Sequence, residues 1–349
     1  MLTIQTSEAV NVTRGLMVLL LIFIHWSPGV FERLSWDYLA ITNPIFRIAT
    51  PGFAMIFGLS MGLYIFQRFK TDPKKAILRL RKSFFVLALA ILILAAIKFS
   101  IIYLEGSINL NLLPASIFFS VLLYYLLAIA SIPLWYYILN KFKNVIIASL
   151  AASLIMYVLA DFAKILLPSS AGLDGFLRLA GLMIEAKYNY FDMSAVVFMG
   201  IALGVYINNL LKTEQKGYDL LSVGILLIFL GVLISYETGQ IDLWQTIEIT
   251  PIWMDISYFG TVIVMLSIAL RYSYVINKSD LPNFIFRIIA VLGTYSLWIY
   301  IGHGLVIPLK DLFIAMGLNY SVSITSSILL FTVAVAIPTA RRYKKFYIR

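Results

Sequence analysis

The chain has 349 residues, of which 61% are hydrophobic and 13% charged, and it contains no cysteine. This balance excludes a water-soluble globular domain and indicates a polytopic membrane protein, while the missing cysteine excludes disulfides, thiolate metal sites and cysteine nucleophiles. A net charge of +10 would suggest a nucleic-acid partner in a soluble protein. Here the basic residues cluster on alternate loops, as membrane topology requires, so we expect no nucleic-acid binding.

Apolar runs of about 20 residues predict about ten transmembrane helices, so the expected fold is an all-α helix bundle. The first run has no basic leader and no small-residue cleavage site, and we expect it to be a retained span instead of a signal peptide. The predicted spans are 11–31, 44–67, 83–104, 110–139, 144–166, 190–211, 219–236, 252–272, 284–308 and 320–340.

The distribution of charge predicts that both termini lie in the cytoplasm. With the N-terminus inside, 20 of the 27 lysines and arginines fall on inner loops or on the basic tail 341–349, and 12 of the 17 acidic residues fall outside. Positive residues are enriched on the cytoplasmic side of membrane proteins. The expected location is therefore the cell membrane, with the chain crossing it several times.

We expect one integral-membrane domain over residues 1–349, because no hydrophilic stretch is long enough to form a separate soluble domain. The longest break, 161–190, contains a moderately apolar segment that fits a short interfacial or re-entrant helix. Two pairs of glycines are each four residues apart, so that the two members of a pair lie on one helical face: Gly58 with Gly62, and Gly200 with Gly204. This pattern predicts close helix packing rather than function.

A basic segment, 74–82, leads directly into an apolar run. The simpler interpretation is anchoring beside anionic lipid on the inner side. The alternative is that some of these cations hold the phosphates of a cytoplasmic cofactor, for which the guanidinium groups of Arg79 and Arg81 are better suited than the Lys82 amine.

The chain has two histidines, and both lie in apolar runs, where an ionisable group is costly unless it has a function or a partner. His25 follows Arg14 by eleven residues, which places the two positions on one face of the first helix, about 16 Å apart along its axis. Arg14 would then lie at the cytoplasmic mouth and His25 beyond the middle of the membrane. This alignment favours a functional histidine and a ligand with a charged head and a long arm.

The second histidine, His303, is sixteen residues beyond Arg287 in the predicted ninth span, about 24 Å along a continuous helix. Ser296 lies seven residues earlier, on the same face. A neutral imidazole bonded to a neighbouring carbonyl explains His303 about as well as a direct role does. A metal held by both histidines and Asp255 is conceivable, but the chain has no close ligand spacing, and we expect no metal.

The segment from Arg14 to His25 resembles the first helix of the membrane acyltransferase superfamily, which contains the acyltransferase-3 family and the heparan-α-glucosaminide N-acetyltransferase relatives. An arginine, ten residues and a histidine are the hallmark of that helix. The segment 292–303 looks like the late helix of the same superfamily, and 51–61 is similar to the second helix of its N-acetyltransferase branch.

The resemblance implies transfer of an acyl group, usually acetyl, from cytoplasmic acyl-coenzyme A to a hydroxyl or amine of a sugar or glycolipid at the outer side. It implies that Arg14, with Arg79 or Arg81, holds the coenzyme A phosphates. The family pattern has two arginines three residues apart near the third helix, and here that spacing gives Arg79 and Lys82. Acyl-coenzyme A is the only cofactor that the resemblance implies.

Acyl transfer needs removal of the acceptor's proton and stabilisation of the carbonyl oxyanion. His25 is the expected general base, or a transient carrier of the acyl group; the sequence does not separate these mechanisms. His303, Ser296 and Tyr300 are expected to orient the acceptor or to donate to the oxyanion, and Asp255 is expected to contact the acceptor on the outer side.

A transporter or flippase for a glycan or lipid is the alternative function, since ten apolar spans with glycine-bearing faces would also serve that role. Coupled carriers usually keep carboxylates near the midplane of the membrane and have broken helices in matching halves. In this chain the carboxylates in question fall near predicted outer ends: Glu105, Asp161, Glu237 and Asp255. The acyltransferase interpretation therefore fits better. The oligomeric state is not predicted.

Overall fold

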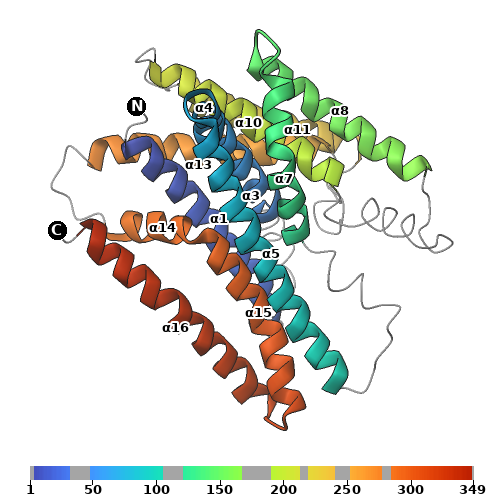
Figure 1. Ribbon diagram of the computed structural model, residues 1–349, viewed down its shortest axis with the longest axis vertical. Coiled ribbons are helices and arrows are strands. Elements are labelled where there is room, and N and C mark those ends of the chain that lie inside the picture. Colours follow the sequence, from blue (N-terminus) through green and yellow to red (C-terminus); the bar gives the residue numbers. More distant parts are fainter. Residues whose placement is uncertain are drawn as a thin grey trace. The chain divides into compact units, whose positions relative to one another are not determined.

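The computed structural model describes residues 4–31, 48–104, 121–166, 190–212, 219–239, 252–276 and 284–347, and within them it contains helices and no strand (Figure 1). The all-α prediction is confirmed. The elements are α1 (Ile4–Phe31), α3 (Ala49–Ser60), the π-helix η1 (Met61–Ile65), α4 (Phe66–Thr71), α5 (Pro73–Leu104), α7 (Val121–Leu139), α8 (Val145–Leu166), α10 (Tyr190–Lys212), α11 (Asp219–Glu237), α13 (Ile252–Ile276), α14 (Phe284–Thr294), α15 (Ser296–Ala315) and α16 (Tyr320–Tyr347).

The described helices agree with a membrane-spanning chain. Seven helical segments in the described ranges are long and apolar enough to cross a bilayer. Each of the ten predicted runs contains a described helix, and α1, α5 and the pair α14 and α15 account for the three beyond those seven. Large apolar side chains are exposed along α8, α11 and α16, as expected for faces that lipid covers. The predicted segment within 161–190 lies mostly outside the described residues.

The ninth predicted span, 284–308, is wrong as a single helix. α14 ends at Thr294 and α15 begins at Ser296, because Tyr295 leaves the helical conformation, with φ −97° and ψ 11°. The glycine just before this break, Gly293, is where α14 packs directly against the backbone of α1. The 24 Å separation expected between Arg287 and His303 along one continuous helix therefore does not apply.

Side chains at the helix starts explain several boundaries. Asp72 accepts a hydrogen bond from the backbone N–H of Lys75 at 3.1 Å, and Pro73 occupies the first position of α5, where its missing N–H costs nothing. Helix α5 thus begins ten residues before the predicted span, and the basic segment 74–82 is helical. Asn144 and Asn319 cap α8 and α16 in the same way.

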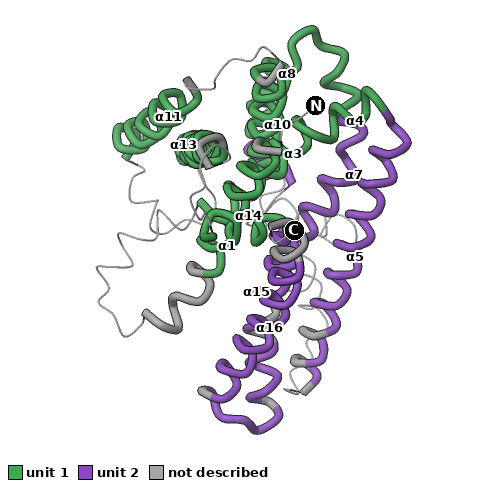
Figure 2. The backbone as a smooth tube through the Cα atoms, turned by 90° about the vertical axis from the view of Figure 1, so that its left-hand side faces the viewer, with its two compact units in different colours: residues 1–71, 136–159, 191–294 green, residues 72–135, 160–190, 295–349 purple. Residues whose placement is uncertain are grey.

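The helices cluster into two compact units (Figure 2). Unit 1 comprises residues 1–71, 136–159 and 191–294, and unit 2 comprises residues 72–135, 160–190 and 295–349. Each unit is described separately below. The single domain over 1–349 remains a prediction.

In unit 1, α1 packs against α14, α13 and α3, and α11 packs against α13. Buried methionines and aliphatic side chains fill the space between these helices, among them Met17, Met55, Leu59 and Ile201. Gly224 of α11 and Gly260 of α13 allow the two helix backbones to approach closely.

The predicted glycine pairs meet each other, which confirms their packing role. A methyl group added at Gly58 or Gly62 would collide with backbone carbonyls of α10, and one added at Gly200 or Gly204 would collide with carbonyls of α3. The bare backbones of the two segments therefore lie in direct contact. This contact fixes the position of η1 along α10.

In unit 2, α15 packs against α5 and α16. Figure 1 and Figure 2 both show α15 and α16 side by side, joined by a tight turn in which Gly317 adopts a φ of 90°. The Lys310 amine pairs with Asp311 at 3.0 Å and lies 5.3 Å from the ring centre of Tyr320, which links the two helices near this turn.

We expect Gly200→Ala to lower the thermal midpoint of the protein in detergent. The added methyl would meet backbone atoms of Met55 and Leu59, which cannot turn aside, and overpacking of this kind costs about 1–3 kcal/mol. Gly302→Ala is the matched control, because its methyl would meet only the Phe331 ring, at 3.1 Å. Equal midpoints for the two variants would contradict the proposed backbone contact.

Candidate functional site

Arg14 and His25 lie on one uninterrupted helix, α1, of 28 residues. The rise of an α-helix separates the two positions by about 16 Å and places them at nearly the same angle around the axis. The spacing argument made from the sequence is therefore valid for the backbone. The side chain of His25 lies outside the described part of the structure.

The Arg14 guanidinium is held by two neighbouring side chains. Its Nη2 donates a hydrogen bond of 2.6 Å to Oγ of Ser60 in α3, and Nη1 makes a longer contact of 3.4 Å with Oδ1 of Asn11. The Ser60 hydroxyl in turn donates to the Ile56 carbonyl at 2.8 Å, so its lone pair is directed toward the arginine. Arg14 is half-buried, which strengthens this charge-assisted bond relative to one in water.

Ser60 stands at a change of helix type. It is the last residue of α3, and η1 begins at Met61 with a backbone bond from the Phe66 N–H to the Met61 carbonyl, five residues apart. Single π-turns are uncommon and occur often at functional sites. No sequence pattern predicted this turn or the pairing of Ser60 and Asn11 with Arg14.

The backbone beside Arg14 is tightly packed. A methyl group at Gly15 would collide with the Ile289 carbonyl of α14, and one at Gly293 would collide with the Asn11 carbonyl of α1. The two helices are therefore in direct backbone contact next to both Asn11 and Arg14. This contact restricts the rotation and sliding of α1, and so fixes the position from which the guanidinium projects.

Three residues predicted to assist the chemistry, Ser296, Tyr300 and His303, lie on α15 in unit 2. Ser296 is buried and Tyr300 half-buried, whereas the His303 side chain lies outside the described part of the structure. These residues share one helix of unit 2, and the Arg14 group belongs to unit 1. Their roles remain predictions.

The predicted phosphate-binding cations Arg79, Arg81 and Lys82 lie on α5, also in unit 2, and all three are exposed. Exposure at the basic end of a helix suits both interpretations made from the sequence, anchoring at an anionic lipid surface and binding of a phosphate-bearing cofactor. Their assignment therefore remains a prediction.

Asp255 lies in the first turn of α13 and is buried, with 1% of its surface exposed. Its Oδ2 accepts a hydrogen bond of 2.7 Å from the Tyr157 hydroxyl of α8, in the same unit. An acceptor would have to compete with the Tyr157 hydroxyl for Oδ2 of this carboxylate. The sequence did not predict a role for Tyr157, because nothing in its local sequence distinguishes it among the 21 tyrosines of the chain.

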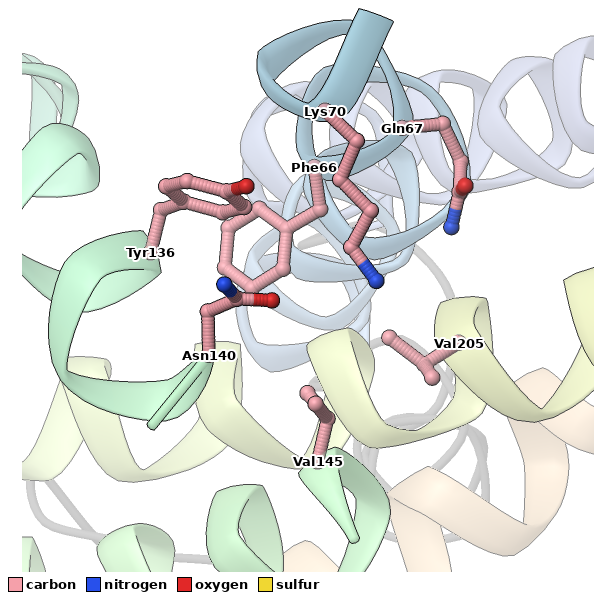
Figure 3. Close-up of a pocket in the computed structure, with 7 residues that line it drawn as sticks. All are labelled: Phe66, Gln67, Lys70, Tyr136, Asn140, Val145 and Val205. Carbon is pink, nitrogen blue, oxygen red and sulfur yellow. The ribbon is translucent and has the colours of Figure 1, made fainter. Parts of the chain in front are cut away.

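A hollow with about 260 Å³ of empty space, part of it open to solvent, lies in unit 1 where α4, the end of α7, the start of α8 and α10 meet (Figure 3). Tyr136 forms one wall. Its ring is stacked on that of Phe69, with the ring centres 4.7 Å apart, and packs edge-on against that of Phe66, with the ring centres 5.3 Å apart. The sequence did not predict this hollow. Its lining residues are Phe66, Gln67, Lys70, Tyr136, Asn140, Val145 and Val205.

No cluster of three or more histidine, cysteine, aspartate or glutamate side chains suited to a metal is present in the described part of the chain. This finding does not bear on a metal held by the two histidines, since their side chains fall outside that part.

Comparison with known proteins gives one family. A model of the acyltransferase-3 family, described as an acyltransferase domain, matches residues 7–341, which is nearly the whole chain. No curated protein and no solved structure matches the chain. The matched range includes α1 with Arg14 and His25, the segment around Ser60, and α15.

Proposed function

The chain belongs to the acyltransferase-3 family and is an integral-membrane acyltransferase, and we propose that it moves an acetyl group from cytoplasmic acyl-coenzyme A to a hydroxyl or amine of a sugar or glycolipid on the outer side. The carbohydrate acceptor is the part of this proposal that rests on family resemblance alone. The donor is argued from the residues of α1.

The observation that carries the proposal is the fixed guanidinium of Arg14 on the same uninterrupted helix as His25. A donor with a phosphate-bearing head and a long uncharged arm suits such an arrangement. Arg14 lies ten residues after the first residue of α1, so the charged head would bind beside the helix and its arm would cover the distance of about 16 Å to position 25. Guanidinium groups bind phosphate through paired hydrogen bonds.

In the proposed reaction, the acceptor's oxygen or nitrogen attacks the thioester carbonyl carbon and the carbon–sulfur bond breaks. His25 takes the acceptor's proton and passes it to the departing sulfur, so that coenzyme A leaves as a thiol. In the alternative path the His25 imidazole attacks the thioester and is acylated, and coenzyme A leaves as a thiol with the imidazole's proton. The acceptor then attacks the acyl-imidazole, and its proton returns to the imidazole nitrogen that is released. Both paths need the same imidazole. Ser296, Tyr300 and His303 would orient the acceptor or donate to the oxyanion.

We predict that His25→Ala lowers acyl transfer by about 10²-fold or more, because general-base catalysis typically contributes 10²–10⁴-fold. The assay uses acetyl-coenzyme A labelled in its acetyl group. It measures the release of coenzyme A and the transfer of label to the protein or to added glycans. Leu19→Ala is the control on the same helix, since Leu19 is 42% exposed and should tolerate truncation. Wild-type turnover by a folded His25→Ala protein would remove His25 from the mechanism. Movement of substrate without thioester cleavage would favour a transporter.

We further predict that Arg14→Ala raises the apparent KM for acyl-coenzyme A about tenfold and leaves kcat nearly unchanged, because a phosphate contact stabilises ground and transition states alike. Ser60→Ala should raise KM by a smaller factor in the same direction. In the Arg14→Ala background it should have little further effect, because the bond that it removes is then already lost.

Ser267→Ala is the matched control for this pair. Its hydroxyl is buried and donates to the carbonyl four residues earlier in its own helix, as that of Ser60 does, but among the described residues it accepts no bond from an arginine. An unchanged KM in Arg14→Ala would exclude Arg14 from donor binding. Fully additive effects of the two substitutions would show that Ser60 does not act through Arg14.

A further inference from the structure

The hollow of unit 1 contains polar groups that the proposed mechanism does not use. Figure 3 shows the Lys70 side chain extending toward Val145 and Val205, with the Asn140 amide on the opposite side beside Phe66 and the Gln67 amide at the edge. Among the described residues, none forms a hydrogen bond or an ion pair with these three side chains. The hollow therefore presents one ammonium group and two carboxamides to a ligand.

The charge of the hollow favours an anion. Among the described residues, no carboxylate lines it and Lys70 is the one ionised side chain in its wall. Val145, which also lines it, is the first residue of α8, whose dipole adds to the local positive potential, although Asn144 already accepts hydrogen bonds from the N–H groups of Ile146 and Ile147. At the end of α7, the carbonyls of Ile138 and Leu139 accept hydrogen bonds from the backbone of the turn that follows.

The sequence places this hollow on the inner side, because the loops that contain Lys70 and the residues after Asn140 fall on the predicted cytoplasmic face. Two further cations lie in the adjacent turn. Lys141 is placed over the Tyr137 ring at 4.3 Å, and Lys143 is exposed. They raise the local positive potential without entering the hollow.

We propose that this hollow binds a phosphate group, with the Lys70 ammonium as the charged ligand and the amides of Asn140 and Gln67 as neutral donors. A small tetrahedral oxyanion suits a shallow site with one cation and several donors. Two cytoplasmic sources present that chemistry, the head group of an anionic phospholipid and the phosphates of coenzyme A. The second source rests on the proposed function, whereas the first does not.

The test uses the full-length protein and two phosphate probes. Adenosine 3′,5′-bisphosphate, which carries coenzyme A phosphates without the thiol arm, is titrated against protein in phosphatidylcholine nanodiscs. Phosphatidylglycerol is scored by native mass spectrometry of detergent-purified protein. The variants are Lys70→Gln, which removes the charge, and Asn140→Asp, which adds a repelling carboxylate. Lys143→Gln is the matched control, with the same loss of charge on the adjacent turn.

We expect Lys70→Gln to weaken binding of one probe about five- to tenfold, Asn140→Asp to weaken it at least as much, and Lys143→Gln to change it less than about twofold. Weaker bisphosphate binding identifies the donor as the source, and weaker phosphatidylglycerol binding identifies lipid. The proposal is overturned if neither probe responds to Lys70→Gln, or if Lys143→Gln has an equal effect. Thermal midpoints are measured for every variant, so that loss of folding is recognised.

Cleavage of acetyl-coenzyme A by the wild type, measured in parallel, separates the two proposals. If the wild type cleaves the thioester while Lys70→Gln changes the binding of neither probe, the hollow does not bind phosphate and the proposed function stands. If the wild type cleaves nothing while lipid binding depends on Lys70, the proposed function fails and the hollow assignment stands.

Discussion

A guanidinium group inside a helix bundle needs oxygen atoms to satisfy its donors, and Arg14 obtains one from Ser60 at 2.6 Å. This bond joins α1 to α3 at the residue where α3 changes into the π-helix η1. The glycine contacts between η1 and α10 fix the serine's own segment, and the contact of Gly15 with α14 fixes the arginine's. Arg14 is thus positioned from both sides, as a binding group for an anionic ligand should be.

The helical architecture could be predicted because its signals are local. Apolar runs, the glycine pairs and the spacing from Arg14 to His25 all follow from periodicity within one segment. The pairing of Ser60 with Arg14, the Tyr157–Asp255 bond and the hollow beside Lys70 join segments far apart in the chain, and no local pattern encodes them. The break at Tyr295 was missed because both sides of it are equally apolar.

The residues proposed to bind phosphate and those proposed to catalyse the transfer differ in where they lie, in keeping with the free-energy cost of placing a charge in a membrane. Of the groups assigned to phosphates, Lys70 and the cations of α5 lie where the sequence predicts the inner ends of helices, and anions can be bound there with little desolvation, whereas Arg14 lies ten residues inside α1 and bonds to Ser60. The groups assigned to chemistry, His25 and the α15 residues, lie in apolar runs. An imidazole acts as a base or nucleophile in its neutral form.

If the donor enters at one face only, the release of coenzyme A in proteoliposomes depends on the side of the membrane that holds the donor, and this dependence is the most direct test. Vesicles are sorted by protease access to the basic tail 341–349, and acetyl-coenzyme A is supplied either outside or sealed inside. Release of coenzyme A is followed with a thiol reagent present on the donor's side. Our account predicts release only when the donor is on the same side as the tail. Equal release from either side would contradict it.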